Sequence, residues 1–270
     1  MRLLPLRALV LIALLGAPLA ILLIAVPPIA QDPAYHRLAD DRVFFSVPNF
    51  WNVASNLAFF LVGIVGLASC VRESRPRKSG TSPAWTVFFA GTVLVAFGSA
   101  YYHWKPDDAA LLWDRLPMTI AFMGLFVALL SEHIDEALEK KLLVPAIVVG
   151  IASLAWWRYA HDLRLYAWVQ FAPLIAIVYL FFAYSARYTH RSCLLYGLAF
   201  YVLAKVAEHL DGQIFGWSSG IVSGHTLKHV LAAGAPLWVY LMLERRSRIV
   251  STAAGTRPDS VPTLKRHSKI

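Results

Sequence analysis

The sequence predicts an all-α, polytopic transmembrane helix bundle with a seven-helix core and one extra N-terminal helix. Hydrophobic residues make up 58% of the 270-residue chain, charged residues only 15%, and the mean hydropathy is +0.57. A soluble domain usually carries about 25% charged residues. The apolar residues also form long runs, close to the roughly 17–25 residues that a helix needs to cross a bilayer. Because lipid offers the backbone no hydrogen-bond partners, these runs must be helices.

Eight apolar runs follow one another along the chain, and short polar connections leave no room for an inserted soluble domain. Basic residues precede the first run, as in a signal peptide. Its apolar stretch is longer than the usual ~7–15 residues, however, and no clean cleavage site follows, so we favour an uncleaved signal anchor or extra transmembrane helix. The runs cover residues 8–27, 50–71, 85–103, 114–130, 142–157, 165–184, 193–210 and 225–243.

These runs divide the chain into four parts. Residues 1–28 form the N-terminal hydrophobic helix, residues 29–49 an extracytoplasmic segment, and residues 50–244 the seven-helix membrane domain. Residues 245–270 form a basic tail that we expect to be cytoplasmic and disordered. Lys and Arg gather on the side of the N-terminus, so the positive-inside rule places both termini in the cytoplasm. Topology and anionic lipid then explain the net charge of +9, and no nucleic-acid partner is expected.

Three polar clusters lie within the apolar runs, where an ionisable group is costly and marks a candidate functional site. Ser99 and His103 lie four residues apart at the end of the third run and share one helix face. Asp114 opens the fourth run, where a helix N-terminus favours a carboxylate. His225 and His229 lie four residues apart at the start of the last run. Because helix direction alternates, all three clusters are expected at one depth, in the extracytoplasmic leaflet.

The clusters together offer the parts of a metal-assisted hydrolase. His103, His225 and His229 supply three neutral imidazoles, a zinc set that leaves the fourth position open for water. Zinc would lower the pKa of that water to about 7. Asp114 would then act as general base and later general acid, and Ser99 would donate to a developing oxyanion. Taken singly, each cluster also fits a structural role, as interfacial histidines, an N-terminal cap at Asp114 or an interhelical hydrogen bond from Ser99.

The motifs that contain these residues resemble the alkaline ceramidase family, part of a wider superfamily of seven-helix intramembrane zinc hydrolases that includes adiponectin-receptor-like proteins. The resemblance covers about residues 40–244. It implies cleavage of the N-acyl bond of ceramide-type membrane lipids, to a sphingoid base and a fatty acid, by attack of zinc-bound water. It also implies that His103, His225 and His229 bind Zn²⁺ and that Ser99 and Asp114 act on the reacting atoms. The motifs are residues 48–56, Gly98-Ser99-x-x-Tyr102-His103, Trp113-Asp114-Arg115-Leu116-Pro117-Met118 and Gly224-His225-x-x-Lys228-His229.

The chain departs from that family in its charged residues. Arg115 follows Asp114 where the eukaryotic members of the family tend to have Glu. The acidic N-terminal stretch associated with calcium is not recognisable, which leaves a Ca²⁺ site unsupported, and we interpret Asp40 and Asp41 as a solvated loop. We interpret Lys228 as a residue that snorkels to the membrane interface.

Other polar residues have structural interpretations. Asn52 and Asn56 fit interhelical hydrogen bonds better than a pocket lining, and Lys205 and Glu208 are spaced to pair with each other.

The alternative function is a ligand-sensing receptor or a metal transporter without hydrolase activity. A transporter needs polar residues through to the inner side, whereas the inner halves of these runs are almost purely apolar. The pattern therefore favours a pocket open at one face, and it does not specify an oligomeric state.

Overall fold

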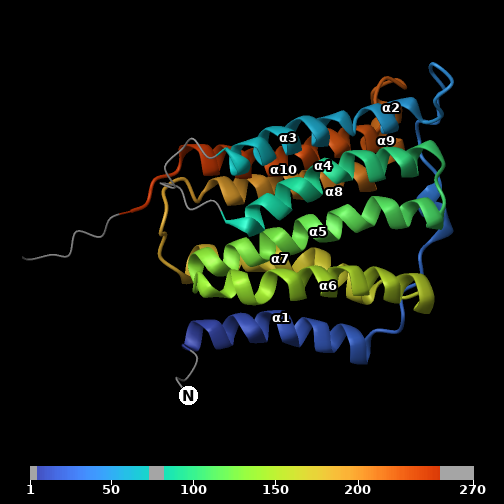
Figure 1. Ribbon diagram of the computed structural model, residues 1–270. Helices are drawn as coiled ribbons and strands as arrows, with labels where there is room; N and C mark the ends of the chain where they lie inside the picture. The colour runs from blue at the N-terminus through green and yellow to red at the C-terminus, as the bar shows by residue number, and fades with distance from the viewer. Residues whose placement is uncertain (1–4, 73–81, 250–270) are drawn as a thin grey trace, which may run out of the picture.

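A computed structural model of the chain describes residues 5–72 and 82–249. All eight apolar runs form helix, and no β-strand occurs within these ranges. The long helices lie alongside one another, so the predicted all-α bundle is confirmed (Figure 1). The elements are α1 (Leu6–Ala25), the 3-10 helix η1 (Pro33–His36), α2 (Phe50–Ala54), α3 (Leu57–Val71), α4 (Pro83–Trp104), α5 (Asp108–His133), α6 (Ala137–Ala160), α7 (Arg164–Ala183), α8 (Cys193–His209), α9 (Asp211–Trp217) and α10 (Gly224–Arg245).

The bundle has the helix lengths and surface of a multi-pass membrane protein. In the described ranges, six helical segments are long and apolar enough to cross a membrane: α1, α2 with α3, α4, α5, α7 and α10. The pair α8 and α9, bent by 81°, makes a seventh if the two helices are counted as one span. The helix α6 is not among them, but it packs against both α5 and α7. Large apolar side chains such as Phe97, Tyr159 and Phe182 are exposed, as expected where lipid replaces water around the bundle.

Glycines allow close helix contacts near the three polar clusters. A Cβ atom on Gly98 of α4 would lie 2.1 Å from the backbone oxygen of Trp113 on α5, a distance that no side chain can occupy. A Cβ on Gly224 of α10 would lie 2.2 Å from the backbone oxygen of Ala207 on α8. These contacts bring α4 against α5 and α10 against α8 at the end of the bundle that carries the candidate site residues.

The extra N-terminal helix packs on α7, outside the other helices (Figure 1). The indole Nε1 of Trp168 donates to the backbone oxygen of Leu15 at 3.1 Å. At the C-terminal end of α1, Arg164 donates to the backbone oxygen of Val26 at 2.6 Å. The carboxylate of Asp162, only 1% exposed, holds Arg164 in place with a 2.8 Å ion pair. The bond from Arg164 satisfies a backbone oxygen at the C-terminal end of α1 that its own helix leaves without a partner.

The end of the bundle away from the polar clusters is closed by a buried ion pair. Arg246, which directly follows α10, lies 2.7 Å from Glu132 of α5, and the indole Nε1 of Trp85 donates to the same carboxylate at 2.6 Å. These bonds fix the start of the predicted tail. Most of that tail, from residue 250 onward, lies outside the described residues.

Candidate functional site

The three histidines predicted to bind metal meet inside the bundle. His103 lies in the last turn of α4, while His225 and His229 lie in the first two turns of α10. The Nε2 atom of His103 is 3.1 Å from Nε2 of His229 and 3.3 Å from Nε2 of His225. All three rings are buried, with at most 4% of each residue exposed, and their ligand atoms all lie within 4.8 Å of one another. This group could hold a metal ion.

The spacing of these nitrogens fits a tetrahedral zinc ion. With Zn–N bonds of ~2.0–2.1 Å, two ligands at the tetrahedral angle are about 3.3 Å apart. Both Nε2 separations measured from His103 are close to that value. Each neutral imidazole has one donor and one acceptor nitrogen, so three Nε2 atoms that converge cannot all satisfy one another. A shared cation would accept all three lone pairs, and three histidines are the ligand set of catalytic zinc sites.

Two residues that precede α3 orient the candidate ligands. The hydroxyl oxygen of Ser55 lies 2.8 Å from Nδ1 of His229, which turns Nε2 of that ring toward His103. The amide of Asn49 donates to the backbone oxygen of His103 at 2.9 Å. Sequence analysis missed the role of Ser55. Its position three residues after Asn52, on the same helix face, is the signal that could have identified it.

Ser99 and Asp114 lie near the histidines, on α4 and α5. They are 3% and 6% exposed, they line the same cavity as His229, and their side chains are close enough to interact. The suggested capping role of Asp114 is wrong. The helix begins six residues earlier, at Asp108, because the carboxylate of Asp107 accepts a hydrogen bond from the backbone N–H of Ala110 at 2.7 Å. Asp114 is therefore an interior helix residue that faces the cavity.

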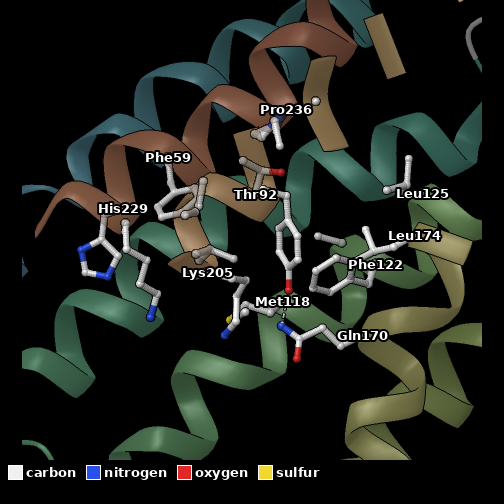
Figure 2. Close-up of a pocket in the computed structure, with 18 of the residues that line it drawn as sticks. Phe59, Thr92, Met118, Phe122, Leu125, Gln170, Leu174, Lys205, His229 and Pro236 are labelled. Atoms are coloured by element: carbon white, nitrogen blue, oxygen red, sulfur yellow. Dashed lines mark hydrogen bonds between the residues drawn. The ribbon is translucent and has the colours of Figure 1, made fainter. Parts of the chain in front are cut away.

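A cavity of about 240 Å³ extends from this polar end into the apolar interior. Figure 2 shows His229 at one end of the view and Leu125 toward the other. Along α10 the lining runs from Lys228 to Val239, about 16 Å at 1.5 Å per residue, or half of the ~30 Å hydrocarbon layer. Such a shape suits an acyl chain. Its apolar walls include Phe59, Phe88, Val95, Phe122, Leu174 and Ile177.

Glu208 joins two lysines at the polar end of the cavity. Its Oε1 atom lies 2.5 Å from Nζ of Lys228, and its Oε2 atom pairs with Lys205. The predicted pair of Lys205 and Glu208 is therefore confirmed, with a third member. The predicted snorkelling of Lys228 is wrong, because its amine turns inward to Glu208 and lies 3.4 Å from Nε2 of His225. An inward carboxylate partner satisfies the ammonium without exposure at the interface.

The segment between α1 and α2 folds over this polar end. The hydroxyl of Tyr35 donates to Oε1 of Glu208 at 3.1 Å. Burial, together with the nearby Glu208 carboxylate, raises the pKa of Tyr35 well above its usual value, so this hydroxyl stays a donor. Farther along, the backbone N–H of Ala39 donates to Asp211 at 2.9 Å, and Asp211 also accepts from the backbone N–H of His225 at 2.7 Å. The covering segment and the start of α10 thus share one carboxylate.

The predicted solvated loop at Asp40 and Asp41 is only half correct. Asp41 is exposed, but Asp40 is 1% exposed, and its two carboxylate oxygens accept from Arg42 at 2.7 and 2.6 Å. The backbone oxygen of Asp40 accepts from Asn52, whose own side-chain oxygen accepts from Thr226 of α10 at 3.0 Å. The interhelical role predicted for Asn52 and Asn56 is therefore confirmed for Asn52 and wrong for Asn56, whose amide donates to the backbone oxygen of Asn52 in its own segment.

Comparison with protein-family models identifies the family of the chain. The family model described as Ceramidase matches residues 42–244, well over half of the chain. The matched region contains all three histidines together with Ser99 and Asp114, and it leaves out α1. A comparison with curated proteins found no match.

Proposed function

The chain belongs to the ceramidase family, and on that premise we propose that it is an intramembrane, zinc-dependent amidohydrolase. Its substrate would be the N-acyl bond of a ceramide-type lipid, and its products a sphingoid base and a fatty acid. The observation that carries this proposal is the meeting of three buried histidines with Asp114 and Ser99 at the polar end of an apolar cavity. Family membership supports hydrolysis of ceramide in general, and the three-histidine donor set supports zinc.

The cavity orients the lipid by polarity. Its apolar length along α10 suits the acyl chain, because a chain that enters from the bilayer exchanges one apolar environment for another and exposes no apolar surface to water. The amide bond would then lie at the polar end, near Ser99, Asp114 and His229, and the head group would lie under the segment that carries Tyr35.

Each side chain at the polar end of the cavity has its own role in the proposed reaction. A zinc ion held by His103, His225 and His229 would supply Lewis acidity and an activated water. Asp114 accepts a proton from the attacking water and delivers it to the amide nitrogen as the carbon–nitrogen bond breaks. Ser99 donates a hydrogen bond to the carbonyl oxygen as negative charge develops there. The oxygen of water ends in the fatty acid, and the nitrogen leaves as the free amine of the sphingoid base.

Release of fatty acid from ceramide by the purified protein in detergent tests this function. We expect Asp114→Asn to lower kcat by about 10²–10⁴-fold, the usual contribution of a positioned acid–base group. Asp41→Asn, which changes an exposed carboxylate in the segment between η1 and α2, is the matched control and should leave kcat unchanged. Full activity in Asp114→Asn, or no fatty acid released by the wild type, would contradict the proposal.

We also infer that both termini face the cytoplasm and that the histidines lie toward the extracytoplasmic leaflet. The first residues of α1 and the last residues of α10 lie at the same end of the bundle (Figure 1), and the loop between α4 and α5 lies at the other. Basic residues cluster at the end with the termini, which supports a cytoplasmic location by the positive-inside rule. A reporter enzyme active only outside the cytoplasm, fused after α10, should be inactive. High reporter activity would show the opposite orientation, with the C-terminus outside the cytoplasm.

A further inference from the structure

Arg115 is a buried cation at the polar end of the cavity, and the proposed reaction does not use it. The residue is 6% exposed and lines the cavity with Asp114, which directly precedes it. Within residues 5–72 and 82–249 it makes no ion pair, and its Nη1 atom has no hydrogen-bond partner. Its Nη2 atom donates to the side-chain oxygen of Gln31 at 2.7 Å. A guanidinium buried in this way is costly, so it marks a functional site by default.

Aromatic rings hold this guanidinium without neutralising it. Its central carbon lies 4.4 Å from the ring centre of Trp157, 4.8 Å from that of Tyr166 and 5.7 Å from that of Tyr35. Cation–π contacts stabilise a buried cation by about 2 kcal/mol or more where water is excluded, but they leave its full charge in place. Because Tyr35 and Tyr166 line the cavity as well, this charge is held at the cavity wall.

A short chain of contacts connects Arg115 with the histidines. Its guanidinium lies over the ring of Tyr35, and the Tyr35 hydroxyl donates to Glu208. Glu208 in turn pairs with Lys228, whose amine lies beside His225. The guanidinium therefore lies at the same end of the cavity as the candidate metal ligands, where the head group of a bound lipid would lie.

The charges that line the described part of this cavity are not balanced. Three cations line it, Arg115, Lys205 and Lys228, against two carboxylates, Asp114 and Glu208. Glu208 already pairs with both lysines, and Asp114 forms no ion pair with Arg115. A metal ion on neutral histidines would add to the positive surplus. A ligand with an anionic group would offset it, whereas a neutral head group would leave the guanidinium uncompensated.

We propose that Arg115 makes this cavity selective for N-acyl lipids whose head group carries an anionic oxygen group, such as a phosphate monoester. A planar guanidinium binds phosphate and carboxylate through two parallel N–H···O bonds, which a hydroxyl group cannot reproduce. The inference rests on the proposed function for the N-acyl part of the ligand. The same anionic chemistry is offered by the carboxylate of the released fatty acid, so the test has to separate head group from product.

Equilibrium binding in detergent tests this selectivity. The probes are ceramide and ceramide 1-phosphate with the same fluorescent dodecanoyl chain, and the free fluorescent dodecanoic acid. The full-length protein carries Ser99→Ala, which slows turnover of the probes without changing the charges that line the cavity. We expect the phosphate probe to bind about tenfold more tightly than neutral ceramide. Adding Arg115→Gln should equalise the two, while adding Arg37→Gln, an exposed cation outside the cavity lining, should preserve the preference.

The possible results separate a role of Arg115 in head-group binding from a role in product binding. Equal binding of the two lipids by protein that retains Arg115 would overturn the inference, whether or not Arg115→Gln folds. A preference for the phosphate lipid that persists in Arg115→Gln would also overturn it. Tight binding of the free fatty acid, with no difference between the two lipids, would show that Arg115 binds the carboxylate of the product instead. A preference without hydrolysis of either lipid by the wild type would support the role of Arg115 and refute the proposed hydrolase, so the two failures are distinguishable.

Discussion

The Nε2 atoms of His103 and His229 lie 3.1 Å apart, although 126 residues separate the two histidines in sequence. Both rings are at most 1% exposed, so water cannot satisfy them. Nδ1 of His229 already interacts with Ser55, which sets the direction of its ring. Nδ1 of His103 has no hydrogen-bond partner in the described residues. With the Nε2 atom of His225 at 3.3 Å from that of His103, the three rings form a donor set for a cation.

The histidine geometry predicts the metal content of the purified protein. We expect about one zinc ion per wild-type chain and none in the His225→Ala/His229→Ala double variant, because one remaining imidazole cannot hold the ion. Elemental analysis by mass spectrometry, after purification without added metal, measures this. His190→Ala, which removes an exposed histidine, is the control and should retain zinc. Zinc bound to the double variant, or absent from the wild type, would disprove the site.

The Ser55 contact predicts an effect on metal affinity. Ser55→Ala should weaken zinc binding by about 10–100-fold, the usual cost of losing the partner of a metal-binding imidazole. Competition with a chelator measures the affinity. Ser55→Thr, which keeps a hydroxyl, should restore most of it, and Ser192→Ala at an exposed position should have no effect. Unchanged affinity in Ser55→Ala would show that His229 is oriented by packing alone.

The approach of α4 to α5 predicts a stability effect at Gly98. A methyl group there would meet the backbone oxygen of Trp113 at 2.1 Å, so the two helices must separate. We expect Gly98→Ala to cost about 1–3 kcal/mol, as overpacking usually does, and to lower activity by moving Ser99 away from Asp114. Thermal unfolding followed by tryptophan fluorescence measures the first effect. Gly16→Ala, where no atom lies within 4 Å of the new methyl, should not lower Tm.

The docking of α1 predicts a dependence of stability on pH. Hydrogen bonds from Arg164 hold the pKa of Asp162 well below its usual 3.8. A carboxyl group whose pKa falls on folding contributes stability that is complete above the unfolded-state pKa and is lost as the pH falls through the folded-state pKa. Asp162→Asn should therefore have a lower Tm than the wild type near pH 7, and the gap should close only below about pH 4.

Scanning calorimetry in detergent across this pH range tests the contribution of Asp162. Asp41→Asn, at an exposed carboxylate, should show the wild-type profile. A Tm gap that is absent near pH 7, or one that widens in acid, would show that the ion pair with Arg164 does not stabilise the fold.

The membrane fold could be predicted from the sequence because it depends on local properties. Long apolar runs must form helices in lipid, whatever their neighbours are. The spacing of four residues between His225 and His229 places both rings on one helix face, and alternating helix direction predicts their depth together with His103. These predictions depend only on the spacing of residues in the sequence.

The partners of each charged side chain were decided only by the tertiary structure. Asp114 faces the cavity because Asp107 starts the helix earlier, and Lys228 turns inward because Glu208 of α8 lies opposite. The aromatic surroundings of Arg115 come from η1, α6 and α7, which are distant in sequence. Sequence thus determined which residues are polar within the apolar helices and at which helix ends they lie. Packing determined what they contact, because the rotation and approach of each helix depend on close contacts such as that of Gly98 with α5.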